Sequence, residues 1–212
     1  MLTNTLEQTY YIIDFDSTFT QVEGLDELAN IALAGSPQRE NIVKQIRELT
    51  EKGMNGEMSF AEGLRRRIEL LSANRSHIDT LVDFLRTKIS NSFARNRAFL
   101  TEYADNILII SSGFKEFIVP IVTEMGLKEE NVYANTFVFD EKDNIIGVDE
   151  TNVLSKDKGK VKLLESLHLE GEVCAIGDGY TDYELRSSGL ATRFYAFTEN
   201  VERQKVVDVA DH

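Results

Sequence analysis

The chain has 212 residues, 42% of them hydrophobic, and a formal net charge of −13. This composition is typical of a folded globular protein with one large or two small domains. The negative charge disfavours nucleic acid and anionic membrane surfaces as partners. The single cysteine, Cys174, excludes a disulfide within the chain, and neither a membrane-spanning stretch nor a signal peptide is evident. We therefore expect a cytoplasmic protein.

The first predicted element is a strand over residues 10–13, Tyr-Tyr-Ile-Ile. A short apolar run without alternation is typical of a strand buried on both faces of a parallel sheet. Asp14 and Asp16 follow it, and because side chains alternate along a strand, both start on the same side. Two buried carboxylates need neutralisation, and a hard divalent cation such as Mg²⁺ supplies it. A carboxylate in this setting can also attack phosphorus.

Two other interpretations of this segment exist. Aspartates after a strand often only form a turn, because they hydrogen-bond their own backbone. A calcium loop of the EF-hand type is the second alternative, but Phe19 stands where that loop needs glycine and Leu25 where it needs glutamate. The residues alone leave phosphoryl chemistry and a simple turn as the open possibilities.

Four helices are predicted after Thr18, because apolar residues recur there at helical spacing over about 80 residues. The first starts near Leu25 and closes near Gly35, and the second runs from the Ser36-Pro37 cap to Gly53. Capping signals open the other two, at Ser59 with Glu62 and at Ser76 with Asp79. We expect residues 20–93 to form a helical cap domain inserted after the first strand.

Strands and helices alternate in the second half of the chain. Buried strands are predicted at 106–110, 173–176 and 191–197, helices at 114–125 and 159–167, and a hairpin over 137–148. This alternation predicts an α/β fold with a Rossmann-like parallel sheet and helices on both faces, formed by residues 1–19 and 94–212. Ligands bind such sheets at the carboxyl ends of the strands, where Asp14, Ser111 and Asp178 would meet.

A second acidic pair, Asp178 and Asp182, follows the strand at 173–176. With Asp14 it predicts a magnesium site, to which Asp14 and Asp178 contribute carboxylate oxygens and Asp16 a backbone carbonyl. Asp182 is expected just outside the metal ligands, holding a water or a neighbouring ligand. An Asp-Gly turn by itself is also a common hairpin signal, although the helical segment that follows disfavours a hairpin here.

Ser111, Ser112 and Gly113 precede a predicted helix, whose exposed N–H groups and dipole would bind an anion. An ordinary serine N-cap explains the same residues. Lys158 lies in the run Ser155-Lys156-Asp157-Lys158-Gly159-Lys160, where a solvated lysine is the ordinary interpretation.

These segments together resemble the four motifs of the haloacid-dehalogenase-like (HAD) phosphatases, in order and over nearly the whole chain. The matching segments are Asp14-Phe15-Asp16-Ser17-Thr18, Ser111-Ser112-Gly113-Phe114, Lys158-Gly159 and Gly177-Asp178-Gly179-Tyr180-Thr181-Asp182. A helical cap after the first motif marks one subclass, within which the chain is most similar to the phosphoserine phosphatase family.

The resemblance implies a magnesium-dependent phosphoric monoester hydrolase of serine biosynthesis. Asp14 would be the nucleophile that forms an aspartyl phosphate, and Asp16 would protonate the leaving alkoxide and then activate water. Ser111 would bind a phosphoryl oxygen, and Lys158, the lysine that falls on the third motif, would offset negative charge. Asp178 would complete the metal site, with Thr18 and Asp182 just outside it. Positioning and charge neutralisation of this kind are what phosphoryl transfer requires.

The resemblance also assigns residues to the substrate, O-phosphoserine. Glu23 falls on the position that meets the ammonium group, and Arg67 on the position that meets the carboxylate through a bidentate contact. Met54 and Phe60 match apolar residues that close over the substrate, and Ser112 and Gly113 belong to the phosphate loop. Taken without the resemblance, Glu23 is a helix-start carboxylate and Arg67 part of a solvated helix face.

Departures from the family pattern are Ser112, where glycine is frequent, and Tyr180, where alanine is frequent. The segment Ala210-Asp211-His212 looks like the start of another strand, and some relatives are fused to phosphoglycerate dehydrogenase, so a fusion to further C-terminal domains is one expectation. Three activities remain open: hydrolysis of O-phosphoserine; hydrolysis or transfer of another small phosphate monoester, such as transfer to homoserine; and a non-catalytic regulatory module that accepts a phosphoryl group.

Overall fold

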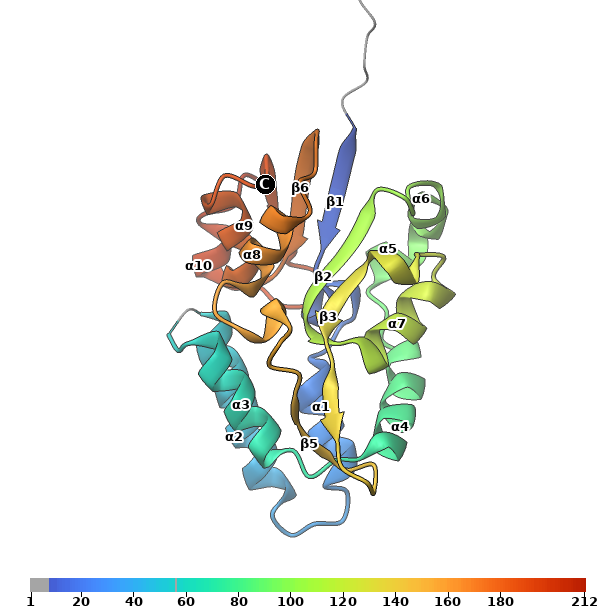
Figure 1. Ribbon diagram of the computed structural model, residues 1–212, viewed down its shortest axis with the longest axis vertical. Helices are drawn as coiled ribbons and strands as arrows, with labels where there is room; N and C mark the ends of the chain where they lie inside the picture. The colour runs from blue at the N-terminus through green and yellow to red at the C-terminus, as the bar shows by residue number, and fades with distance from the viewer. Residues whose placement is uncertain (1–7, 56) are drawn as a thin grey trace, which may run out of the picture.

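The computed structural model describes residues 8–55 and 57–212. Its centre is a five-stranded parallel sheet with the strand order β3-β2-β1-β6-β7 (Figure 1). The strands are β1 (Thr9–Ile13), β2 (Ile107–Phe114), β3 (Val132–Asn135), β6 (Glu172–Gly177) and β7 (Arg193–Ala196). The predicted α/β fold is confirmed. Strand β3 was not predicted, and β2 continues beyond the predicted end at residue 110 to Phe114.

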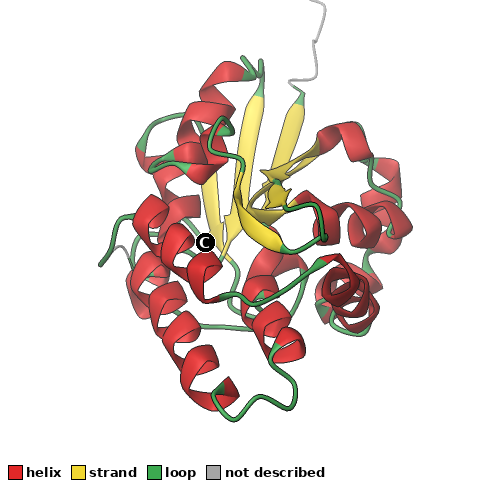
Figure 2. Cartoon of the chain, turned by 60° about the horizontal axis from the view of Figure 1, so that its bottom comes forward, coloured by secondary structure: helices red, strands yellow, loops and turns green. Residues whose placement is uncertain are grey.

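Helices cover both faces of the sheet (Figure 2), and the strand residues alternate between two apolar clusters. Ile13, Ile107 and Ile109 face one cluster, and Ile12 and Leu108 face the other. This explains the unbroken apolar runs of β1 and β2, since both of their faces are buried. The helices in this half of the chain are α5 (Asn91–Arg95), α6 (Arg97–Glu102), α7 (Lys115–Glu124), α8 (Gly159–Ser166), α9 (Tyr180–Ser187) and α10 (Gln204–Val207).

Four helices form the lower half of the molecule in Figure 1: α1 (Gly24–Ala32), α2 (Arg39–Met54), α3 (Phe60–Leu70) and α4 (Arg75–Arg86). Ser59 is the N-cap of α3, as predicted, and accepts a hydrogen bond from the Glu62 N–H. Two predicted starts were wrong. Helix α2 begins at Arg39, after a turn at residues 36–38, and α4 begins after Asn74, whose side chain forms a capping box with His77.

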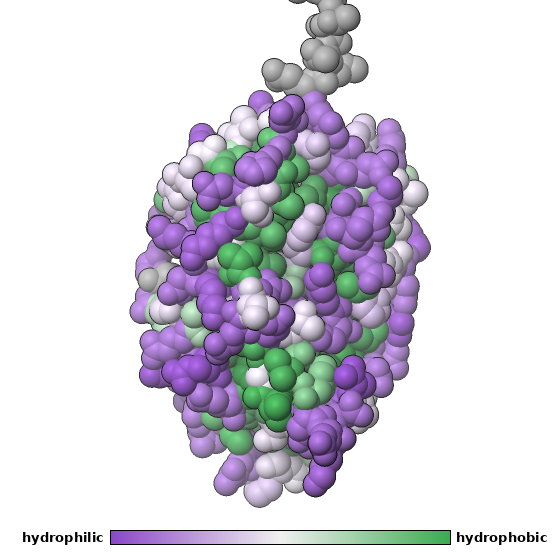
Figure 3. All heavy atoms as spheres, viewed as in Figure 1, coloured by the Kyte–Doolittle hydropathy of each residue, from purple (hydrophilic) through white to green (hydrophobic). Residues whose placement is uncertain are grey.

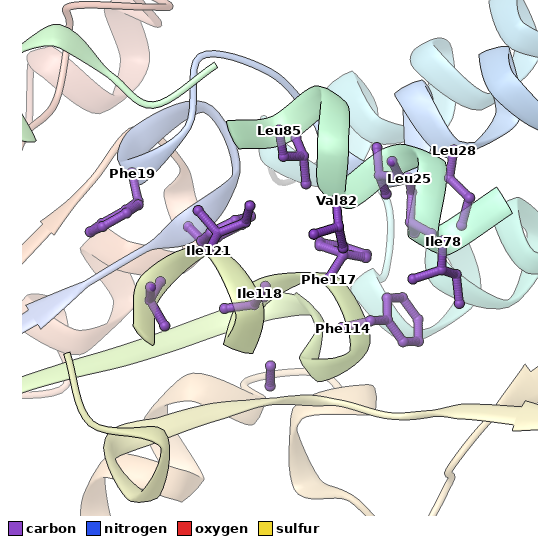
Figure 4. Close-up of a cluster of buried hydrophobic side chains, with 14 of the residues drawn as sticks. Phe19, Leu25, Leu28, Ile78, Val82, Leu85, Phe114, Phe117, Ile118 and Ile121 are labelled. Carbon is purple, nitrogen blue, oxygen red and sulfur yellow. The ribbon is translucent and has the colours of Figure 1, made fainter. Parts of the chain in front are cut away.

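The helical segment shares an apolar core with the sheet half. Side chains of α1 and α4, among them Leu25, Val82 and Leu85, pack with Phe117 and Ile121 of α7 (Figure 4). The predicted hairpin is present as β4 (Phe137–Phe139) and β5 (Ile145–Val148), and it packs against α3. The predicted cap, residues 20–93, is therefore joined in space by a hairpin from the second half of the chain.

The face shown in Figure 3 is mostly hydrophilic, in keeping with the net charge of −13. Hydrophobic residues appear in the centre of its upper half and again in its lower half, where α3 and the hairpin lie in Figure 1. Val138 and Ile146 of the hairpin are exposed. Among the described residues, no helix has the length and apolar character needed to cross a membrane.

Candidate active site

The first site residue, Asp14, leaves the end of β1 at the centre of the sheet. Its N–H donates to the carbonyl of Ile176 at the end of β6, with 3.0 Å between N and O. The chain then makes a tight helical turn, η1 (Phe15–Phe19), in which Ser17 has a left-handed φ of 54°. The side chain of Asn200 donates to the Ser17 carbonyl at 3.1 Å and helps to hold this turn. The parallel pairing of β1 with β6 thus brings Asp14 next to the segment that carries Asp178.

Three buried aspartates, Asp14, Asp178 and Asp182, lie together at the carboxyl ends of β1 and β6. Each offers a carboxylate oxygen, and these oxygens lie within 4.8 Å of one another. Glycine at position 177 makes the arrangement possible, because a Cβ there would lie 2.2 Å from Cγ of Asp182. The gathering of acidic side chains at the strand ends agrees with the sequence prediction.

The cation beside Asp14 is Lys160, not Lys158. Lys160 Nζ lies 2.9 Å from Asp14 Oδ1 and 2.6 Å from Asp182 Oδ1, and the side chain is only 3% exposed. Burial lowers the pKa of Lys160, but the two carboxylates outweigh burial and raise it, so the amine stays charged. Lys158 is exposed and has a left-handed φ of 57° just before α8. The placement of Lys158 at Asp14 is therefore corrected, and Lys158 instead lines the cleft described below.

Asp16 is buried and held by the loop that follows it. Its Oδ1 accepts a hydrogen bond from the Gly24 N–H at 2.7 Å. Its Oδ2 lies near Gly113, where a Cβ would be only 2.7 Å away, so position 113 has no room for a side chain. Burial, and then the negative charges of Glu23 and Asp14, raise the pKa of Asp16 well above its ordinary value. Burial thus favours the protonated carboxyl, which is the form that a general acid requires.

The serine loop at the end of β2 bulges out of the sheet beside Asp16. Between the pairs Ile110–Tyr133 and Phe114–Asn135 the register shifts, which leaves residues 111–113 outside the ladder. Ser111 is fully buried, and its Oγ accepts a hydrogen bond from the Gly113 N–H at 2.9 Å. The Ser111 hydroxyl proton remains available for an anion near Asp16.

Glu23 lies on the helical side of the same centre. Its Oε1 accepts a hydrogen bond from Ser17 Oγ at 2.5 Å. Burial raises the pKa of Glu23, whereas the Ser17 hydrogen bond and the charges of Arg203 and Arg67 oppose that rise. Glu23 is thus a half-buried carboxylate next to the loop that carries Asp14 and Asp16.

Arg67 is buried in the helical half, at 8% exposure. Its Nη1 donates to Thr50 Oγ1 at 3.2 Å, and the Thr50 hydroxyl lies 3.0 Å from Asp26 Oδ1. Within the described part of the chain, the buried Nε of Arg67 has no hydrogen-bond partner. Arg67 lines a small pocket together with Phe60 of α3 and Thr181 of α9, so the pocket lies between the two halves of the molecule. The guanidinium has hydrogen-bonding capacity that the protein leaves unused.

A cleft of about 210 Å³ connects this region with the serine loop. Phe60 lines its helical side, and Ser112, Lys158 and Lys160 line its sheet side. The other predicted closing residue, Met54, ends α2, but its side chain lies outside the described part of the structure. Of the predicted substrate-contacting residues, Phe60 and Ser112 line this cleft, and Arg67 lines the smaller pocket beside it.

Arg203 is a site residue that the sequence did not indicate. It is buried, it forms an ion pair with Asp178, and its Nη2 lies 3.4 Å from Glu51 Oε1 on α2. Its charge also acts on Glu23. Arg203 lies in a polar stretch without periodicity, so no sequence pattern distinguishes it from a surface arginine.

The donor set of the acidic cluster suits a divalent cation, because carboxylate oxygens are the ligands that Mg²⁺ takes from proteins. Thr18 Oγ1 donates to Asp178 Oδ1 at 3.0 Å, which orients that carboxylate. Asp182 is engaged by Lys160 and by the Gly179 N–H, and Asp178 by Thr18 and Arg203. Asp14 receives its contacts from Lys160 and the Phe15 N–H on Oδ1, which leaves Oδ2 without a hydrogen bond among the described residues. The contribution of the Asp16 carbonyl stays a prediction.

The parallel sheet, the helical insert and this cluster define a member of the HAD-like superfamily of phosphatases. No family model matches the chain. It is 30% identical over 201 residues to phosphoserine phosphatase of Homo sapiens. The aligned region covers 93% of this chain and 84% of the human protein. It is also 30% identical over 201 residues to the chloroplastic phosphoserine phosphatase of Arabidopsis thaliana, of whose length it spans 65%. The chain belongs to the phosphoserine phosphatase family.

Solved structures agree with this placement. A phosphoserine phosphohydrolase-like protein from Francisella tularensis superimposes with a TM-score of 0.84 at 28% identity, over 97% of this chain and 94% of that one. A phosphoserine phosphatase solved as a phospho-aspartyl intermediate analogue superimposes with a TM-score of 0.75 over 97% of this chain and 91% of that one. Its identity is 22%, and it supports the fold.

Proposed function

We propose that the protein hydrolyses O-phosphoserine to serine and phosphate, with Mg²⁺, through an aspartyl phosphate on Asp14. The observation that carries this proposal is the pairing of a buried phosphoryl-transfer centre with two groups of opposite charge, the half-buried Glu23 and the buried Arg67. The phosphoryl-transfer centre suits a phosphate monoester. The pair of Glu23 and Arg67 suits a leaving group that carries both an ammonium and a carboxylate. Membership of the phosphoserine phosphatase family supports the same substrate.

In the first step, a carboxylate oxygen of Asp14 attacks phosphorus and the bond from phosphorus to the serine oxygen breaks. Asp16, whose protonated form burial favours by raising its pKa, gives its proton to the departing serine oxygen. The Ser111 hydroxyl binds a phosphoryl oxygen, and Lys160 offsets the negative charge gathered at Asp14. Asp14, Asp178 and the backbone carbonyl of Asp16 would hold Mg²⁺, which would supply positive charge to the phosphoryl group.

In the second step, Asp16, now a carboxylate, takes a proton from water. The resulting hydroxide attacks phosphorus, the bond to Asp14 breaks, and inorganic phosphate leaves. Asp16 ends the cycle protonated, as it began. One carboxyl can serve in both directions because burial raises its pKa and so makes the protonated form accessible.

The amino acid end of the substrate would lie between the two halves of the molecule. Glu23 would accept hydrogen bonds from the ammonium group, and the free donors of Arg67 would bind the carboxylate. Thr50 and Asp26 hold Arg67 in place from behind. Arg203, which forms an ion pair with Asp178 and lies close enough to act on Glu23, adds positive charge beside these two carboxylates.

A substrate panel tests this proposal. Phosphate release is measured with phosphoserine, phosphothreonine, phosphoethanolamine and sugar phosphates, with and without Mg²⁺, and homoserine is added as a competing acceptor. We expect a clear preference for phosphoserine and little phosphohomoserine. Equal rates across the panel would remove the substrate assignment and leave the reaction class. Phosphohomoserine as the main product would favour a phosphotransferase, and a stable phosphoprotein without turnover would favour a regulatory module.

Arg67 offers a sharper test, because Arg66 beside it is an exposed control paired with Glu62. We expect Arg67→Ala to raise KM for phosphoserine roughly 10- to 150-fold, the range for a lost hydrogen bond to a charged group. The same variant should leave phosphoethanolamine, which has no carboxylate, nearly unchanged. Arg66→Ala should change neither. An equal loss with both substrates would exclude Arg67 as the carboxylate ligand.

A further inference from the structure

A buried asparagine, Asn135, lies directly behind the serine loop. It is the last residue of β3 and is completely buried. Its register partner is Phe114, the residue at which β2 rejoins the ladder after the bulge at residues 111–113. The asparagine therefore lies where the sheet must accommodate the loop that carries Ser111.

The amide of Asn135 ties two catalytic segments together. Nδ2 donates to the carbonyl of Ser112 at 2.9 Å and to the carbonyl of Leu154 at 3.3 Å. Leu154 belongs to η3 (Val153–Ser155), against which Gly159 packs so closely that a Cβ there would lie 2.5 Å from the Val153 carbonyl. Gly159 directly precedes Lys160. One NH₂ group thus links the serine loop to the segment that presents the lysine.

The contact with Ser112 sets the direction of the next N–H group. A trans peptide is planar, so its C=O and N–H point in opposite directions. With the Ser112 carbonyl turned toward Asn135, the Gly113 N–H points away from it, to Ser111 Oγ at 2.9 Å. That hydrogen bond occupies an acceptor site of the Ser111 hydroxyl and leaves its proton free to donate.

We infer that Asn135 is a positioning residue for phosphate binding, which acts on Ser111 through the Ser112–Gly113 peptide. This inference rests on the proposed function only in taking Ser111 as a phosphoryl ligand. The orientation of the amide follows from its contacts, because swapping its oxygen and nitrogen would place an oxygen against two carbonyls. Asn135→Asp makes that unfavourable arrangement with almost no change in shape.

Asn152 is a matched control. It also links β3 to η3, because its Nδ2 donates to the Ala134 carbonyl at 2.8 Å and its Oδ1 accepts from the Leu154 N–H at 2.9 Å. It has no hydrogen bond to the serine loop among the described residues. Loss of Asn152 should therefore loosen the same strand and turn without disturbing Ser111.

The test measures the dissociation constant of inorganic phosphate by titration calorimetry in excess Mg²⁺, together with the melting temperature. We expect Asn135→Ala to weaken phosphate binding roughly 3- to 10-fold, as for one hydrogen bond, and Asn135→Asp to weaken it more. Asn152→Ala should lower the melting temperature but change phosphate affinity less than about 2-fold. Asn135→Ser, whose side chain is too short to reach both carbonyls, replaces the alanine variant if that variant does not fold.

A double-mutant cycle separates positioning from general loosening. In a Ser111→Ala background, Asn135→Ala should weaken phosphate binding no further, because its route of action has been removed. Additive losses, equal losses for Asn135→Ala and Asn152→Ala, or an unchanged dissociation constant would overturn the inference. Failure of the proposed function looks different: wild-type protein would bind phosphate with the pattern above and yet release none from phosphoserine.

Discussion

Two lysines, Lys158 and Lys160, are candidates for the cation that neutralises the nucleophile Asp14, and substitution of each one distinguishes them. Lys160 Nζ lies 2.9 Å from Asp14 and 2.6 Å from Asp182, whereas Lys158 is exposed. At an effective dielectric constant near 20, each of these contacts corresponds to about 6 kcal/mol of Coulomb attraction before desolvation is subtracted. Removing one partner of such a buried network costs about 3–5 kcal/mol. We expect Lys160→Met to lower the free energy of unfolding by that amount.

The catalytic effect should be similar in free energy to the effect on folding, because the lysine also offsets charge where the phosphoryl group is attacked. We expect Lys160→Met to lower kcat by about 10²–10³, the usual effect of removing one preorganised electrostatic group. Lys158→Met should change the free energy of unfolding by less than about 0.5 kcal/mol and leave kcat close to wild type. Phosphate release and urea unfolding, both at low temperature so that the variants stay folded, measure the two effects.

A reversed result would refute this reasoning. If Lys158→Met abolished turnover while Lys160→Met kept it, the exposed lysine would have to move to Asp14 in the working enzyme. An unchanged free energy of unfolding for Lys160→Met would show that the buried ion pairs contribute nothing to the folded state.

Three further predictions concern the metal, the helical half and its junction with the sheet. Chelation of the metal should abolish phosphate release, and added Mg²⁺ should restore it. Added Mg²⁺ should also raise the melting temperature of the wild type but not that of Asp178→Asn. An equal rise in both proteins would exclude Asp178 as a metal ligand. Burial raises the pKa of Asp26 from 3.8 to about 7, so the stability gained from its buried proton is complete below pH 4 and lost as pH rises to 7. Urea unfolding across that range should therefore show wild type losing up to about 4 kcal/mol relative to Asp26→Asn, and parallel curves would contradict it. Asp157 accepts from Ser59 Oγ at 2.9 Å and from the Ala61 N–H at 3.0 Å, so Asp157→Ala should cost about 1 kcal/mol of stability and raise KM by loosening the cleft; an unchanged KM would separate this contact from substrate binding.

The arrangement of the acidic residues was predictable because it follows from topology. An unbroken apolar run before Asp14 and another before Asp178 indicate buried parallel strands, and such strands end at one edge. Local capping signals also identified α3 correctly at Ser59. Strand β3 was missed because it has four residues at the edge of the sheet and no alternating pattern.

Which of the two lysines lies beside Asp14 depends on where helix α8 begins. Helix α8 begins at Gly159, so Lys160 lies on the same face as the buried Leu164, four residues on. Lys158 precedes the helix in a left-handed conformation that turns its side chain outward. Helical periodicity favours Lys160, whereas the resemblance to the third motif falls on Lys158.

Arg203 and Asn135 show what sequence patterns leave out. Arg203 comes from a polar stretch, and its burial depends on Asp178 and Glu51, which are distant in the chain. Asn135 ends a strand too short to predict, and its partners are carbonyl groups. Neither a charge pattern nor a hydrophobic period reports such long-range polar contacts.

The most direct test of an aspartyl phosphate on Asp14 follows the phosphorus atom during turnover. After a rapid acid quench of enzyme with ³²P-labelled phosphoserine, we expect the label on the peptide that contains Asp14, and its release by hydroxylamine, which cleaves acyl phosphates. Asp14→Asn should carry no label and release no phosphate. Label on another residue, or wild-type turnover by Asp14→Asn, would contradict the account.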